Sequence, residues 1–182
     1  MCGPARPQGD NQPSRSSNAG PSGLLEQQGE NGNYDLACQH WTNLNVWTAA
    51  FVAEYAGTVA VLAEYKIYGV WSISMALEHP DDGMQSDSPT ACLRAACAWI
   101  RIAGNQVASL VGRGDAQGAM GSLWMLSDLH DGSEGQMTHG RWNFWRHRLQ
   151  TISQQDQFSA EGCQLAAEAL QHFDAIQVPK GL

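Results

Sequence analysis

The chain has 182 residues, of which 43% are hydrophobic, and a formal net charge of −8 at pH 7. This length fits one domain with a sizeable core. Because phosphate backbones are bound by Lys and Arg that displace condensed counterions, eighteen Asp and Glu residues against ten Lys and Arg residues argue against nucleic acid as a partner.

The first 33 residues differ in composition from the rest of the chain. They hold four of the seven prolines and, after Met1, only Leu24 and Leu25 as large aliphatic residues. Such a segment buries too little surface to offset its ordering entropy, and it has neither the apolar core of a signal peptide nor an amphipathic transit helix. We predict a disordered tail over residues 1–33, a helical domain over residues 34–182 and a cytoplasmic protein.

Helical periodicity begins after Tyr34. Residues 44, 47, 51 and 55 (Leu, Trp, Phe and Tyr) recur at the spacing of one helix face. After Gly57, a second apolar segment runs from about Thr58 to Glu78 and ends at the HPDDG run; its pattern predicts that Leu62, Ile67, Val70, Trp71 and Leu77 are buried.

The two segments together are apolar enough to raise the question of membrane insertion. Charged residues interrupt them at Glu54, Glu64 and Lys66, and each is unfavourable in hydrocarbon. We therefore expect a buried helical hairpin of a soluble core and no membrane insertion.

A third helix is predicted to begin at Ser88 and Pro89, an N-cap residue followed by a proline at the first helical position. Its apolar stripe includes Gly104, where the missing side chain favours close approach of another helix. The glycines between Gly112 and Gly121 do not follow the order of a phosphate-binding loop, and we interpret this segment as an ordinary loop.

The stretch RWNFWRHRL, residues 141–149, predicts a helix from near Thr138 with Trp142 and Trp145 on its core-facing stripe. Arg141 and Arg148 lie beside that stripe, whereas Phe144 and His147 face elsewhere. Ser159 is expected to cap a last helix that ends before Pro179. Because no run shows the two-residue alternation of a strand, we predict an all-α fold, a single bundle-like domain of about five helices.

The order R-W-x-F-W-x-x-R-L, followed after a polar gap by S-x-E and an alanine-rich helix, resembles the C-terminal signature of a fungal family of small helical proteins of unknown function. The segments PTACLRAACAWIRIAGNQVASLVG and GSLW fit the same pattern, and the resemblance covers roughly Leu44 to Phe173. It implies a filamentous-fungal source and an all-α fold, and it supplies no catalytic residues. Some similar members lie in secondary-metabolite gene clusters, which implies a role in such a pathway.

The residues carry no recognised cofactor or metal signature, so we expect no cofactor and no metal. The polar run SDLHDGSEGQMTHGR contains His130, but its spacing matches no metal motif, and a solvated loop is the simpler interpretation. The five scattered cysteines indicate reduced, mostly buried thiols. Cys97, near Arg94 and Arg101, is the one candidate nucleophile among them.

Two functions remain open. One is a cofactor-free cyclase or pericyclic-type isomerase that folds an apolar terpenoid or polyketide in a tryptophan-lined cavity by proximity and electrostatic preorganisation. The other is a helical interaction or scaffold module that binds a protein partner. For the enzyme, the expected catalytic residues are Arg148, Arg141 and His130, and the expected substrate-binding residues are Trp145, Trp142, Trp99 and Trp124.

Overall fold

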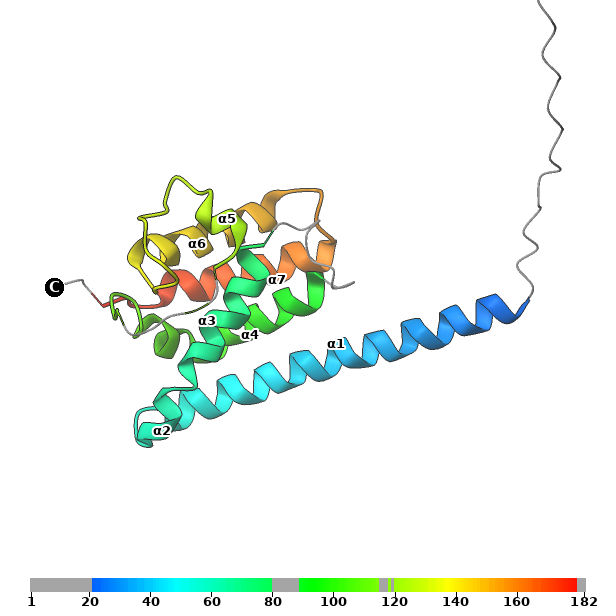
Figure 1. Ribbon diagram of the computed structural model, residues 1–182, viewed down its shortest axis with the longest axis horizontal. Coiled ribbons are helices and arrows are strands. Elements are labelled where there is room, and N and C mark those ends of the chain that lie inside the picture. Colours follow the sequence, from blue (N-terminus) through cyan, green and yellow to red (C-terminus); the bar gives the residue numbers. More distant parts are fainter. Residues whose placement is uncertain (1–20, 80–88, 115–117, 119, 180–182) are drawn as a thin grey trace, which may run out of the picture. The chain divides into compact units, whose positions relative to one another are not determined.

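The computed structural model describes residues 21–79, 89–114, 118 and 120–179. The chain forms two compact units, Met1–Asp35 and Leu36–Leu182. All regular elements of the described residues are helices, which confirms the all-α prediction (Figure 1). They are α1 (Pro21–Tyr55), α2 (Ala60–Ala63), α3 (Lys66–Leu77), α4 (Pro89–Ala108), α5 (Ser122–Met125), α6 (His139–Gln154) and α7 (Ala160–Ala175).

The first helix begins earlier than expected. Residues 1–20 of the proposed tail lie outside the described residues, but the backbone is helical from Pro21, through residues 21–33 that we had assigned to the tail. The run Leu24–Gln28 consists of residue types with good helix propensity. Low hydrophobicity argued against a buried core in this segment, but it does not prevent a helix from forming.

The core of the second unit is built by helices α3, α4, α6 and α7, with α4 packed against both α3 and α7, and α6 against α7 (Figure 1). Close packing of α3 on α4 requires Gly69, because a Cβ there would lie 2.6 Å from Val107 and 2.7 Å from Trp99. At Gly104 an added Cβ would meet the end of the Ile176 side chain, which follows α7. The predicted close approach of another helix is therefore replaced by a contact with the side chain of a residue just beyond a helix.

Local signals for helix starts are confirmed where they can be seen. The Thr138 hydroxyl accepts a hydrogen bond from the Arg141 backbone N–H at 3.1 Å, and the Ser159 hydroxyl accepts one from the Gly162 N–H at 3.1 Å. Both satisfy N–H groups that the first helical turn leaves open. The Ser88 cap lies outside the described residues, whereas α4 begins at Pro89 as expected.

The expected burial of the first apolar stripe is wrong. Among the side chains of α1 that the structure describes, residues 35–55, the buried ones are Asn45, Ala49 and Val52, and the buried Ala56 follows directly after the helix; Trp47 is 63% exposed. Both stripes consist of steps of three and four residues, so periodicity alone cannot choose between them. The smaller residues lie inward because Asn45 Oδ1 accepts hydrogen bonds from Trp99 Nε1 (2.9 Å) and Ser72 Oγ (2.7 Å) in the core.

Two further burial predictions need correction. Trp71, expected inside, is 42% exposed, although Val70 and Leu77 are buried as predicted. Phe144, expected to face away from the core, is buried with its ring centroid 5.6 Å from that of Trp124. The α5 segment covers this side of α6, and short irregular segments of that kind leave no periodic signal. Within the described residues, none of the helices combines the length and hydropathy that spanning a bilayer requires.

Candidate functional site

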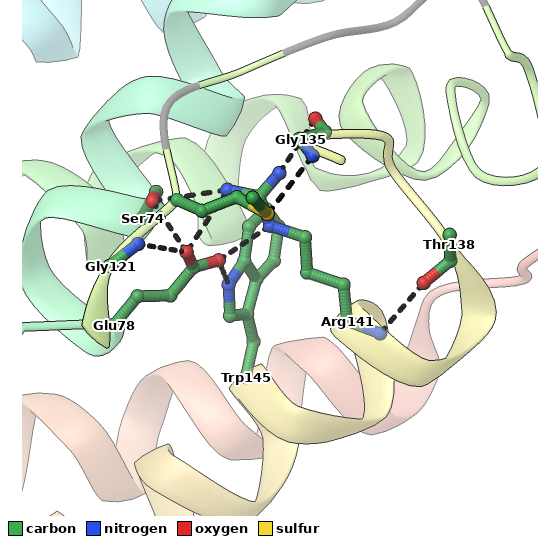
Figure 2. A network of polar contacts seen from close by, with 8 residues as sticks. Ser74, Glu78, Gly121, Gly135, Thr138, Arg141 and Trp145 are labelled. Atoms are coloured by element: carbon green, nitrogen blue, oxygen red, sulfur yellow. Dashed lines mark hydrogen bonds and ion pairs between the residues drawn. The ribbon is translucent and has the colours of Figure 1, made fainter. Parts of the chain in front are cut away.

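A buried ion pair connects the end of α3 with the first turn of α6. Arg141 Nε and Nη2 donate to Glu78 Oε1 at 2.6 Å and to Oε2 at 3.0 Å, and both side chains have no solvent-exposed surface (Figure 2). Two parallel charge-assisted hydrogen bonds fix the relative orientation of a guanidinium and a carboxylate. The pair therefore sets the position of α6 relative to α3.

Other donors complete the surroundings of the carboxylate. The Trp145 indole N–H donates to Glu78 Oε1 at 2.6 Å, and the Gly121 backbone N–H and the Ser74 hydroxyl donate to Oε2 at 3.0 and 2.8 Å. Figure 2 shows all of these groups directed at the one carboxylate. A buried charge is tolerated when it is paired and hydrogen-bonded in this way.

The Arg141 guanidinium also donates hydrogen bonds to groups other than the Glu78 carboxylate. Arg141 Nη1 donates to the Gly135 carbonyl at 2.9 Å and Nη2 to Ser74 Oγ at 3.2 Å. Its Cζ lies 5.7 Å from the centroid of the Trp145 ring, within cation–π range. We call this set of residues the Glu78 network (Ser74, Glu78, Gly121, Gly135, Arg141 and Trp145). It connects α3 and α6 with the loops that contain Gly121 and Gly135.

Local sequence explains how each member reaches the network. Ser74 and Glu78 are one helical turn apart, so they lie on the same face of α3, and Arg141 and Trp145 have the same spacing on α6. At Gly121, a Cβ would clash with the Glu78 backbone carbonyl, so only glycine lets the loop come close enough to donate its N–H. Gly135 has φ +71, a left-handed conformation that favours glycine.

The three expected catalytic residues lie in different surroundings. Arg141 belongs to the Glu78 network, Arg148 is half-buried two turns further along α6, and His130 is half-buried in the loop before α6. Two turns correspond to about 11 Å along the helix axis. The His130 ring instead packs edge-on against Trp124, with centroids 5.1 Å apart. A catalytic role for these three residues stays a prediction.

All four expected substrate-binding tryptophans are buried members of the hydrophobic core. The Trp142 ring stacks on Phe173 with centroids 4.2 Å apart, and Trp99 and Trp145 donate their indole N–H groups to Asn45 and Glu78. Trp124 Nε1 is different: among the described residues, it and His130 Nε2 are buried without a hydrogen-bond partner. Substrate binding by the tryptophans likewise stays a prediction.

The candidate nucleophile Cys97 is poorly suited to reaction. Burial raises the pKa of its thiol to about 12; the nearby Arg101 lowers it by a smaller amount, and Glu168 raises it further. The thiolate is the reactive form, so a thiol of this kind is inert at neutral pH. Among the described residues, no group of three His, Cys, Asp or Glu side chains could hold a metal ion.

The exposed aromatic side chains form two ladders, whose exposure the sequence pattern did not reveal. The α1 ladder consists of Trp47, Phe51 and Tyr55, with adjacent ring centroids 5.2 and 5.1 Å apart. The α3 ladder consists of Tyr65, Tyr68 and Trp71, which begin just before α3 and have adjacent centroids 5.5 and 5.1 Å apart. Five of these six side chains are between 42% and 63% exposed, and Phe51 is less exposed than the others.

Contiguous exposed apolar side chains are one mark of an interaction site. The α1 ladder is extended by Leu44, which is 56% exposed, and the α3 ladder by Met75. Aromatic residues and Met are enriched where proteins bind one another, because they bury much surface with few rotatable bonds. The ladders are thus accessible to solvent, whereas the Glu78 and Arg141 side chains are not.

The architecture is that of an all-helical domain whose polar centre is internal and whose aromatic ladders are external. The chain belongs to the family described as "Protein of unknown function (DUF3632)", whose model matches residues 17–149. The matched range covers most of the chain, includes all of α1 and ends within α6. No curated protein and no solved structure shows significant similarity to the chain.

Proposed function

We propose that this protein is a helical interaction module that binds a protein partner through its two aromatic ladders. The observation that carries the proposal is the distribution of aromatic side chains. The tryptophans that we expected to bind a substrate fill the core, whereas Trp47, Tyr55, Tyr65, Tyr68 and Trp71 are exposed. Exposed ladders lower solubility unless they are covered, so their presence on a folded domain is best explained by a partner.

The Glu78 network supports this role indirectly. Its bonds fix α3 against α6, and α3 carries one of the ladders. A surface held on a rigid helix loses less conformational entropy on binding than one held on a mobile loop. We therefore assign the network to positioning the interaction surface.

The pathway and location of the module are also proposals. The resemblance of the RWNFWRHRL signature to fungal helical proteins supports a filamentous-fungal source and a role in secondary metabolism. The reduced cysteines expected from the sequence support a cytoplasmic location.

The experiment compares tagged protein purified from its native host in three forms. The first is the wild type, the second is Trp47→Ser/Tyr55→Ser, and the third is the control Met125→Ser/Leu126→Ser, which removes exposed apolar side chains from elsewhere on the surface. We expect a stoichiometric partner with the wild type and the control. The ladder variant should lose that partner at an unchanged melting temperature. A partner retained by the ladder variant, or absent from all three forms, contradicts the proposal.

A second candidate is the cofactor-free cyclase or isomerase acting on an apolar metabolite. One observation favours it: Trp124 Nε1 and His130 Nε2 are buried without partners among the described residues, and their rings are in contact. Such groups can donate hydrogen bonds to a substrate. Deletion of the gene and comparison of the metabolite profile tests it, since an unchanged profile excludes an essential enzymatic step.

A further inference from the structure

Negatively charged residues accompany both aromatic ladders. Each has a glutamate beside it in the sequence. Glu54 follows Trp47 by two turns of α1, and Glu64 lies in the connection between α2 and α3, directly before Tyr65, the first ring of the α3 ladder. Both glutamates are exposed, so their carboxylates are available to a partner that covers the ladders.

Between residues 35 and 79, the stretch that carries the ladders, no Lys or Arg is exposed. Between residues 35 and 79 the sequence contains a single Lys or Arg, Lys66. Its side chain is buried, with Nζ donating to Ser109 Oγ at 3.1 Å, and burial, followed by the charge of Arg113, lowers its pKa. The exposed charges of this stretch are therefore negative.

The ring faces act in the same direction as the carboxylates. Trp47 and Trp71 are each more than 40% exposed, and the face of an indole attracts Lys and Arg through its quadrupole. Two independent groups, π-faces and carboxylates, thus favour a cation beside each ladder. Since both would meet a second acidic, aromatic ladder if two copies of this chain paired, self-association through the ladders has no charge complementarity.

We infer that the partner presents an amphipathic helix with one aliphatic face flanked by Lys or Arg. This inference rests on the proposed function and names the class of partner for the same surface. The aliphatic side chains of the partner pack on the ladder rings, while its cations pair with Glu54 and Glu64 and stack on the indoles. The α1 ladder, extended by Leu44, offers about 16 Å of helix for this contact, which is three turns of a partner helix.

The test uses the full chain and two synthetic helical peptides that share a leucine face and differ only in flanking Lys or Glu. Binding is measured for the wild type, for Glu54→Gln/Glu64→Gln and for the control Asp128→Asn/Glu134→Gln. The control removes two exposed carboxylates from the loop before α6, so both variants change the net charge equally. A further variant, Trp47→Ser, reports on the ring contact.

We expect the Lys peptide to bind and the Glu peptide not to bind. The Glu54→Gln/Glu64→Gln variant should weaken binding at least about threefold, as expected for two partly exposed ion pairs, and Trp47→Ser should also weaken it. The control should bind like the wild type. Equal weakening by the two charge variants would mean a nonspecific attraction to an acidic protein, and this result overturns the inference.

Other outcomes separate this inference from the proposed function. Two results would mean that the surface is an interface but its partner is not a basic helix. The first is equal binding of both peptides. The second is that neither peptide binds, while Trp47→Ser/Tyr55→Ser still loses the native partner. If sedimentation shows a dimer that Trp47→Ser dissociates, the occupant is a second copy, and the inference is wrong. If neither peptide binds and no native partner depends on Trp47 and Tyr55, the proposed function fails with it.

Discussion

The Glu78 carboxylate and the Arg141 guanidinium lie 63 residues apart in the chain and meet through bonds of 2.6 and 3.0 Å with no access to solvent. A buried pair contributes little net stability relative to apolar residues of the same shape, but removing one partner leaves an uncompensated charge. Substitution of one partner alone is therefore expected to lower the free energy of unfolding markedly.

Arg141→Met should destabilise the protein by ~3–5 kcal/mol, since Glu78 would remain buried without its cation. Arg146→Met is the matched control on the same helix, because Arg146 pairs with Asp174 at 2.6 Å in an exposed ion pair. That change should alter the free energy of unfolding by less than ~1 kcal/mol. Urea denaturation of both variants checks the contrast, and equal effects would mean that the Glu78–Arg141 pair is open to water.

Gly121→Ala should destabilise the protein by ~1–3 kcal/mol, because the added methyl group meets the Glu78 backbone. At Gly114 an added Cβ meets nothing within 4 Å, so Gly114→Ala should be neutral or slightly stabilising. Thermal unfolding of the two variants distinguishes a required glycine from an incidental one. A neutral Gly121→Ala contradicts the close approach of the loop to α3.

Phe144→Ala should be about as damaging as Trp145→Ala, at ~3–5 kcal/mol each, because both rings are buried. The helical pattern alone predicted a small effect for Phe144, so this pair of variants tests the corrected burial. Tyr68→Ala, which truncates an exposed ring of the α3 ladder, is the control and should change stability by less than ~1 kcal/mol. A small effect at Phe144 would mean that its ring faces away from the core, as the helical pattern predicted.

Cys97 should resist alkylation by iodoacetamide at pH 8 in the folded protein, because its pKa of about 12 leaves almost no thiolate. Cys38 and Cys163 are only half-buried and should react first. Peptide mass spectrometry of partially modified protein gives the order. Rapid modification of Cys97 in folded protein would reopen its role as a nucleophile.

Lys66 should make stability rise with pH at the alkaline end. Its pKa is lowered in the folded state, so the unfolded chain binds more protons in the window between that pKa and the ordinary value of 10.5. The unfavourable burial of the ammonium is fully present below this window and disappears above it. Lys66→Met should therefore stabilise the protein at neutral pH, and its advantage over the wild type should shrink as the pH approaches 10.5. A constant difference between the two contradicts the buried ammonium.

The parts of the fold that sequence reasoning predicted well depend on neighbouring residues. The caps at Thr138 and Ser159 and the helix start at Pro89 are properties of three or four consecutive positions. The stripe on α6 could be recognised because Trp142 and Trp145 are large apolar residues on one side of the helix. On the other side Phe144 is the one large apolar residue, and there the prediction was wrong. In the segment of α1 two stripes of helical spacing were possible, and the hydrogen bonds that Asn45 accepts from Trp99 and Ser72 place one of them inside.

The candidate site was harder to predict because it depends on distant pairs. A glutamate at the end of an apolar helix looks like any polar terminus, so Glu78 was interpreted as the edge of a segment rather than as the partner of Arg141. The spacing Ser74–Glu78 beside an otherwise apolar helix was the one available signal. The ladders were visible in sequence as apolar stripes, but periodicity reports which residues share a face and not whether that face is covered.

Photo-crosslinking in the native host tests most directly whether α1 contacts a protein partner through its exposed ladder. The photoreactive residue p-benzoylphenylalanine is placed at Phe51 or, as a control, at Leu126, an exposed apolar position that is 84% accessible. We expect position 51 to give a discrete crosslinked protein that position 126 does not give, and Trp47→Ser in the same chain should abolish it. Equal or absent crosslinking at the two positions would contradict the claim.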